Sequence, residues 1–191
     1  MNKGRLEAFS DGVLAIIITI MVLELRIPRG ADPAVLRPLI PVALSYVLSF
    51  VHLGIYWNNH HHLLQAVRHV NGRVLWANLG LLFWLSLIPF VTGWMGENYF
   101  AMWPVAFYGA VLWFAGLSYY ILVRALVALH GSESTLATAV GNDVKGRVSL
   151  LIYTAAIVLA FWAPLLACGL YVAVAAIWII PDSRIAKRLE G

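Results

Sequence analysis

Residues 5–25 read RLEAFSDGVLAIIITIMVLEL, and this stretch decides the fold class. From Val13 to Leu23 every residue except Thr19 is apolar, and an acidic residue stands at each edge, Asp11 before the run and Glu24 after it. A helix needs about 20 largely apolar residues to cross the hydrocarbon core of a bilayer. We therefore expect a membrane-spanning helix over about 8–26.

The composition of the whole chain agrees with this expectation. Of its 191 residues, 62% are hydrophobic and only 12% are charged, whereas soluble domains carry about 25% charged residues. A chain this short cannot bury so much apolar surface in one water-facing core. Its net charge of +4 is scattered, without a basic stripe or arm, which argues against a nucleic-acid partner. The composition predicts an all-α integral membrane protein.

Five further apolar segments continue the pattern after the first helix. They cover about 37–62, 72–94, 102–129, 146–163 and 165–180. Only the turn at Ala163-Pro164 separates the last two, so we expect an antiparallel hairpin there. One long kinked helix is the alternative, but it would be about twice the length of a span. The chain thus reads as a single domain, 1–191, with six transmembrane helices.

The basic residues predict the orientation of these helices. With both termini on the cytoplasmic side, ten of the thirteen Lys and Arg residues lie inside. These are Lys3, Arg5, Arg68, Arg73, Arg124, Lys145, Arg147, Arg184, Lys187 and Arg188. Only Arg26, Arg29 and Arg37 lie outside. Cytoplasmic loops carry the excess of Lys and Arg, so we expect a multi-pass cell-membrane protein with cytoplasmic termini.

The first helix differs from the others because it carries a carboxylate at the membrane boundary. A charge there is costly, so Asp11 must face protein or water and needs a partner. At about 100° per residue, one stripe of the helix is formed by Ile16, Thr19, Ile20 and Leu23, and another by Asp11, Ala15, Ile18 and Val22. Either stripe could line a path or pack against a neighbouring helix.

At these residues the sequence resembles a known family. The pattern Arg5-x-x-x-Phe9-Ser10-Asp11, followed by an apolar helix that ends Leu23-Glu24-Leu25, resembles the signature of the transmembrane protein 175 family. The runs 56–61 (YWNNHH), 76–78 (WAN) and 87–90 (LIPF) are also similar to that family. These proteins are endolysosomal potassium channels of animals and their bacterial relatives. Length and helix count fit a bacterial member.

The resemblance implies a homotetramer of six-helix subunits around a central pore lined by the first helices. By position after the Phe-Ser-Asp motif, the pore constriction would be apolar and formed by Ile16, Ile20 and Leu23, with Thr19 on the same stripe. No Thr-Val-Gly-Tyr-Gly stretch occurs, so a backbone-carbonyl filter is not expected. Potassium would be the permeant ion, held transiently rather than at a tight metal site, and no cofactor is implied.

The resemblance also implies a polar network that fixes the first helix against the second and third. Its members would be Arg5, Phe9, Ser10 and Asp11 on the first helix, with Trp57, His60, Trp76 and Asn78. Their expected role is structural rather than ion coordination.

Other functions remain open from the residues alone. The principal alternative is a proton- or cation-coupled transporter that uses Asp11 and the His60–His62 region, because histidine titrates near neutral pH. Three consecutive histidines point in different directions around a helix, so they do not form one site by themselves. An enzyme is not expected, because no second carboxylate or His-x-x-x-His motif accompanies Asp11. An assembly subunit without transport is excluded only by the family resemblance.

Overall fold

The computed structural model describes residues 3–131, 134–141 and 143–179. Every regular element in these ranges is helical. In chain order they are α1 (Lys3–Leu23), η1 (Pro33–Leu39), α2 (Ile40–Gln65), α3 (Gly72–Ser86), α4 (Ile88–Glu97), α5 (Met102–His130), α6 (Thr135–Val140), α7 (Val144–Leu159) and α8 (Pro164–Ile179). Three of the basic residues assigned to the cytoplasmic side, Arg184, Lys187 and Arg188, lie outside the described residues.

The second predicted segment, 37–62, is really two elements. A 3-10 turn, η1, begins at Pro33, where the Asp32 side chain accepts a hydrogen bond from the Ala34 amide at 2.7 Å. Pro38 lies inside η1, and the α-helical pattern begins only at Ile40. Proline supplies no backbone N–H, so this proline-rich entry favours a short 3-10 turn before the regular helix. The helix then runs on to Gln65, beyond the predicted end.

The third predicted segment, 72–94, is also divided. α3 ends at Ser86 and α4 begins at Ile88, with Pro89 in its first turn. Pro89 cannot donate to the carbonyl four residues earlier, and its ring restricts the residue before it. The Leu87 amide instead bonds the Trp84 carbonyl, at 3.2 Å. α3 and α4 still form one continuous membrane-length stretch, Gly72–Glu97.

The connection between the predicted segments 102–129 and 146–163 contains one short helix, α6, in its described residues. The Ser134 hydroxyl caps it by accepting the Ala137 amide at 3.1 Å. Asp143 caps the next helix, α7, in the same way, accepting the Gly146 amide at 3.1 Å. The predicted hairpin at Ala163-Pro164 is present, because α7 and α8 pack against each other as separate helices.

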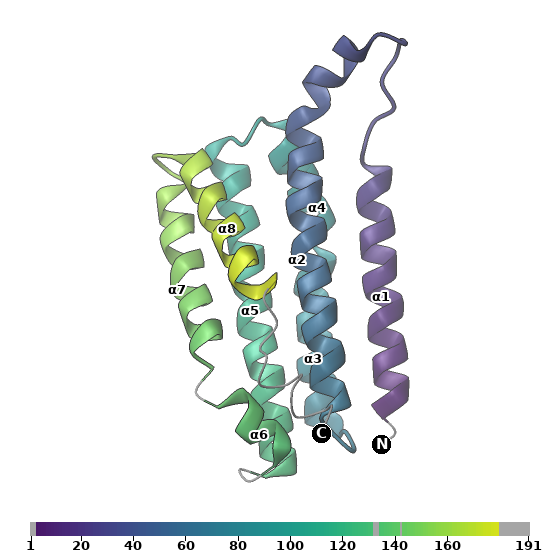
Figure 1. Cartoon of the computed structure of the whole chain (residues 1–191), viewed down its shortest axis with the longest axis vertical. Helices are drawn as coiled ribbons and strands as arrows, with labels where there is room; N and C mark the ends of the chain where they lie inside the picture. Colours follow the sequence, from purple (N-terminus) through teal and green to yellow (C-terminus); the bar gives the residue numbers. More distant parts are fainter. Residues whose placement is uncertain (1–2, 132–133, 142, 180–191) are drawn as a thin grey trace.

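The helices form an elongated bundle with α1 at one edge (Figure 1). α1 contacts α2, α3 and α4, whereas α5 lies at the centre and packs against α3, α4, α7 and α8. α7 and α8 stand on the side opposite α1, and η1 projects beyond the other helices (Figure 1). The arrangement places several polar side chains of α1, among them Ser10 and Asp11, against α2 and α3.

Four stretches of the described residues are long and apolar enough to cross a membrane: 3–23, 33–65, 72–97 and 102–130. This establishes an all-helical, multi-pass membrane architecture, with fewer long spans than the six predicted. α7 and α8 have 16 residues each, which corresponds to about 24 Å of helix. Within the described residues their length falls short of the usual 20, so for this part of the chain their crossing does not follow from length and composition.

Candidate functional site: the first helix and its contacts

One face of α1 packs on the bundle and the opposite face is uncovered in the single chain. The buried face consists of residues spaced three and four apart, namely Leu6, Ser10, Leu14, Ile17 and Met21. The predicted pore stripe lies on the uncovered face, where Ile16 is 60%, Ile20 43% and Leu23 76% exposed. Thr19 is exposed on the same side. Its hydroxyl donates to the Ala15 carbonyl at 2.7 Å, so the hydroxyl hydrogen is used within α1.

The uncovered face borders an open groove between α1 and α4. Ile16 and Ile20 line this groove on one side, with Phe90 and Trp94 on the other and Glu24 at one end. A row of large exposed aliphatic side chains on one helix marks a surface that meets lipid or another protein chain.

A directional chain of hydrogen bonds joins three helices behind this face. The Ser10 hydroxyl of α1 donates to the Leu6 carbonyl at 2.9 Å and accepts from the Asn78 amide of α3 at 3.0 Å. The Asn78 oxygen in turn lies 2.7 Å from Nε2 of His60 on α2. An amide oxygen can only accept, so His60 donates through Nε2. All three side chains are buried, and these hydrogen bonds use their polar atoms except Nδ1 of His60, which has no partner in the described part of the protein.

A second set of contacts runs as a ladder along α1 and α2. The Lys3 amine donates to the Leu64 carbonyl at 3.0 Å. One turn further, Glu7 lies 3.2 Å from Nδ1 of His61. One turn beyond that, Asp11 accepts the Trp57 indole N–H at 3.0 Å. Contacts four residues apart on α1 thus meet partners three and four residues apart, in reverse order, on the antiparallel helix α2.

The structure brings together some of the predicted network residues and leaves others apart. Ser10, Asn78 and His60 are joined directly, and Asp11 contacts Trp57. Arg5 and Phe9 lie on the exposed side of α1, and Trp76 is 76% exposed. These three side chains therefore lie outside the hydrogen-bond chain and the ladder that hold α1 in the described part of the protein.

Sequence reasoning missed Lys3 and Glu7, and it named His61 only within the His60–His62 region of the alternative transporter. The signal was present, because Lys3, Glu7 and Asp11 repeat every four residues, as do Trp57 and His61. Recognising it required the register between two antiparallel helices, which a single sequence does not provide.

The three consecutive histidines have different surroundings. His60 bonds Asn78, His61 approaches Glu7 and stacks on Trp57 with ring centroids 5.9 Å apart, and Nδ1 of His62 has no hydrogen-bond partner among the described residues. Within the described ranges no three His, Cys, Asp or Glu side chains are grouped for metal binding. Two of the three histidines therefore connect α2 to neighbouring helices, His60 to α3 and His61 to α1.

The fold and this site define a class: an all-helical, multi-pass membrane protein with an apolar helix face left uncovered at its edge. Comparison with known proteins then identifies the family. Residues 5–89 match the family described as endosomal/lysosomal potassium channel TMEM175. The chain is 53% identical over 190 residues to a protein named as a potassium channel from Chryseobacterium sp. (strain P1-3), covering 100% of this chain and 99% of that one. The chain belongs to the TMEM175 family, as the sequence resemblance predicted.

Two further relatives extend the comparison. A crystal structure of a lysosomal potassium-selective channel TMEM175 homolog from Chamaesiphon minutus is similar in fold, with a TM-score of 0.79 and 25% identity, over 94% of this chain and 97% of that one. The human protein named endosomal/lysosomal proton channel TMEM175 is 36% identical over 105 residues, which is 49% of this chain and 20% of the human one.

Proposed function

We propose that the protein is a subunit of a potassium-selective channel whose narrow point is an apolar constriction formed by α1. The observation that carries the proposal is the uncovered stripe of Ile16, Ile20 and Leu23 on a helix whose other face is fully packed. The relatives that cover nearly the whole chain, one by sequence and one by fold, bear the names of potassium channels.

The proposed constriction works through hydration rather than through a carbonyl filter. Rings of aliphatic side chains can gate a pore by excluding water. Potassium is more weakly hydrated than sodium, so it sheds water at lower cost when it passes such rings. Thr19, with its hydroxyl rotamer fixed on the same stripe, would contribute a ring of oxygens. Potassium passes transiently in this proposal, and neither a tight metal site nor a cofactor nor an enzymatic activity is part of it.

The proposed assembly is a homotetramer with α1 from each copy around the axis. Each subunit is one channel domain, 1–191, that crosses the membrane six times, with α7 and α8 as the two shorter crossings. Both termini lie in the cytoplasm. The end of the bundle where α1 begins also holds the connection between α2 and α3, the last turns of α5 and the start of α7 (Figure 1). An excess of basic residues in these segments supports the orientation: Lys3, Arg5, Arg68, Arg73, Arg124, Lys145 and Arg147.

Ion flux from proteoliposomes that hold the purified protein tests the proposal. Potassium flux should exceed sodium flux in the natural protein, and Ile16→Asn should raise total flux or bring the two fluxes closer, because an amide ring holds water that isoleucine excludes. Val22→Asn is the matched control, since it lies on the same helix about 120° away from the stripe. Absence of flux in every protein would refute the channel; a silent Ile16→Asn with persisting flux would place the path elsewhere.

Proton permeation is a second candidate, favoured by one observation: the animal relatives are named proton channels. The same liposomes loaded with a pH-sensitive dye separate the two. A potassium channel sets a diffusion potential without net acidification, whereas a proton pathway acidifies the lumen when a pH gradient is imposed. If an opposing potassium gradient drives protons uphill through a fixed ratio, the coupled transporter of Asp11 and the His60–His62 region is the better description.

A further inference from the structure

His61 of α2 stands where this helix meets the first turns of α1. Its Nδ1 lies 3.2 Å from a carboxylate oxygen of Glu7, and its Nε2 lies 2.8 Å from the side-chain nitrogen of Gln65. A carboxylate can only accept, so Nδ1 carries a hydrogen, whereas an amide nitrogen can only donate, so Nε2 accepts with its lone pair. The structure therefore holds His61 as a neutral ring.

Both contacts of this ring survive when it takes up a proton. The added hydrogen lies on Nε2, and a half-turn of the exposed Gln65 amide presents its oxygen there in place of its nitrogen. The bond to Glu7 keeps its geometry and becomes an ion pair, and charge-assisted hydrogen bonds are about twice as strong as neutral ones. Protonation of His61 therefore strengthens an existing contact between α1 and α2.

The nearest charges favour a proton on His61. Glu7 contacts the ring directly, and Asp11 lies one turn further along α1, where it accepts the indole N–H of Trp57. The Trp57 ring stacks on His61 with centroids 5.9 Å apart, and aromatic faces attract cations. The Lys3 amine, which bonds the end of α2, opposes the proton but does not offset a carboxylate in contact. The other charged or titratable side chains of these helices at this end are Arg5 on α1, His60 and His62 on α2, and Arg73 on α3.

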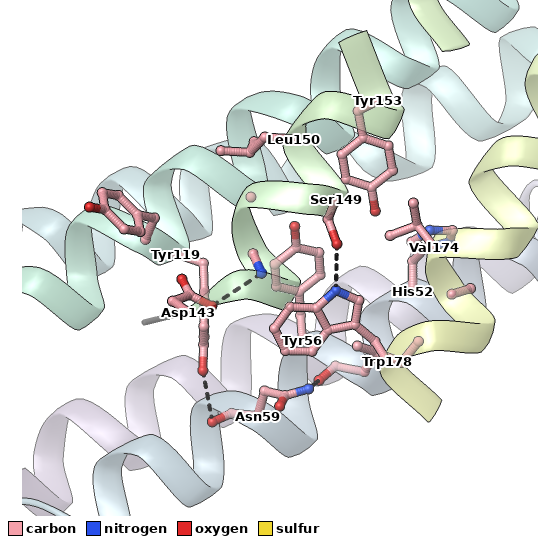
Figure 2. A pocket seen from close by; sticks show the side chains of 15 residues that line it. His52, Tyr56, Asn59, Tyr119, Asp143, Ser149, Leu150, Tyr153, Val174 and Trp178 are labelled. Carbon is pink, nitrogen blue, oxygen red and sulfur yellow. Dashed lines mark hydrogen bonds between the residues drawn. The ribbon is translucent and has the colours of Figure 1, made fainter. Parts of the chain in front are cut away.

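The other described histidines of α2 do not combine access to water with contact to a carboxylate. His52 and Asp143 both line a cavity between α2, α5, α7 and α8, where Figure 2 shows them on opposite sides. The His52 ring is 2% exposed, His60 is equally buried, and Nδ1 of His62 is buried as well. The His61 side chain is 34% exposed, so protons from solvent reach it.

We propose that the Glu7–His61 contact is a proton-binding site through which acidification at this end of the bundle fastens α1 more tightly to α2. Proton uptake accompanies the tighter packing, so lower pH favours the packed state. The added stability is present at acidic pH and is lost as the pH rises through the range in which imidazole titrates. If α1 lines the pore, as in the channel proposal, the attachment of the pore helix depends on cytoplasmic pH.

Thermal unfolding of the purified full chain in detergent, at about pH 8 and about pH 5.5, tests the site. Acidification should raise the midpoint of the natural protein by roughly 2–4 °C more than that of Glu7→Gln. Glutamine still accepts the Nδ1 hydrogen but has no charge. Each variant is compared with itself at two pH values, so a general loss of stability and the titration of other groups cancel.

His61→Asn should lose the same pH-dependent rise, because asparagine donates from near the position of Nδ1 but does not titrate. The double variant should lose no more than either single variant, as expected for two partners of one contact. His69→Asn is the control, since His69 is an exposed histidine outside this contact, and it should keep the rise.

Hydrogen exchange in the first turns of α1 locates the effect. After correction for the intrinsic pH dependence of exchange, protection should increase on acidification in the natural protein and not in Glu7→Gln. Equal midpoint shifts in the natural protein and Glu7→Gln, or a rise that His69→Asn abolishes and His61→Asn retains, overturn the proposal. These readouts do not depend on ion flux, so their failure leaves the channel proposal standing, and the reverse also holds.

Discussion

Asn78 is the side chain on which three helices meet. Its amide donates to Ser10 of α1 and its oxygen accepts from His60 of α2, while its own backbone belongs to α3. The side chain is fully buried, where an unpaired polar atom is far more costly than at the surface. Asn78 can therefore hold the proposed pore helix at a defined rotation relative to its neighbours.

Replacing Asn78 by Leu should lower the stability of the folded chain by about 1–3 kcal/mol, because the His60 donor is left buried without an acceptor. Thermal unfolding of the purified protein in detergent measures the change. Trp76→Phe is the control: Trp76 is exposed and outside the polar contacts that hold α1, so its loss should shift the midpoint little. An equal shift for both substitutions would contradict the assigned role of Asn78.

At the scale of elements, α2 and α4 approach each other closely at Gly96. A Cβ on Gly96 would meet the Ser45 hydroxyl and would lie 2.6 Å from the Val42 Cα atom. The backbone of α2 at Val42 cannot move aside as the end of a flexible side chain can. The path of α4 across α2 therefore depends on a residue without a side chain at this position.

Gly96→Ala should accordingly destabilise the bundle by about 1–3 kcal/mol through overpacking. Gly80→Ala in α3 is the matched control, since a Cβ there meets nothing within 4 Å, and alanine is intrinsically the better helix former. The denaturation midpoint of Gly96→Ala should fall relative to the natural protein, whereas that of Gly80→Ala should stay the same or rise. Comparable midpoints would mean that α4 can move away from α2 at no cost.

The division between α3 and α4 belongs to the same scale. Pro89 is visible in the sequence near the end of the third predicted segment, and an internal proline commonly kinks a helix or ends it. Whether a proline only bends a span or ends one helix and begins another depends on what surrounds it. In α4, which begins after this break, Val91 is buried and Phe90 is exposed and lines the groove beside α1. The position at which α4 begins therefore sets which of its residues face that groove.

For the whole molecule, the decisive feature is that α1 stands at the edge of the bundle with its aliphatic stripe uncovered (Figure 1). The proposed tetramer would bring the four copies of this stripe together around one axis. Cys168 is the one cysteine of the chain. The Cys168→Ser variant therefore has no thiol, and a single cysteine can be introduced into it at a chosen position.

In that background, Leu23→Cys should form disulfide-linked dimers under mild oxidation, because cysteines around a narrow axis come within the 4.4–6.8 Å between Cα atoms that a disulfide needs. It should also react with a membrane-impermeant thiol reagent added outside, as cytoplasmic termini require. Leu151→Cys on α7 is equally exposed in the single chain, 70% against 76%, and should not cross-link. Dimers from Leu151→Cys but not from Leu23→Cys would reverse the assignment of the pore helix.

The sequence by itself determined the class of protein, the family and which residues of α1 share a polar or an apolar face. Those properties are local: apolar length selects the membrane, and positions three and four apart share a helix face. The stripe of Ile16, Ile20 and Leu23 could therefore be assigned to one face from helical geometry alone. The need of Asp11 for a partner also followed from the cost of a carboxylate beside lipid.

Only the tertiary structure decided which partner each polar group has. It placed Trp57 rather than Trp76 beside Asp11, joined His61 to Glu7, and turned Arg5 and Phe9 to the exposed side. It also created the cavity of His52 and Asp143 from helices far apart in the chain. These outcomes depend on the rotation and relative height of packed helices, which the side chains of the whole bundle set together and no single segment encodes.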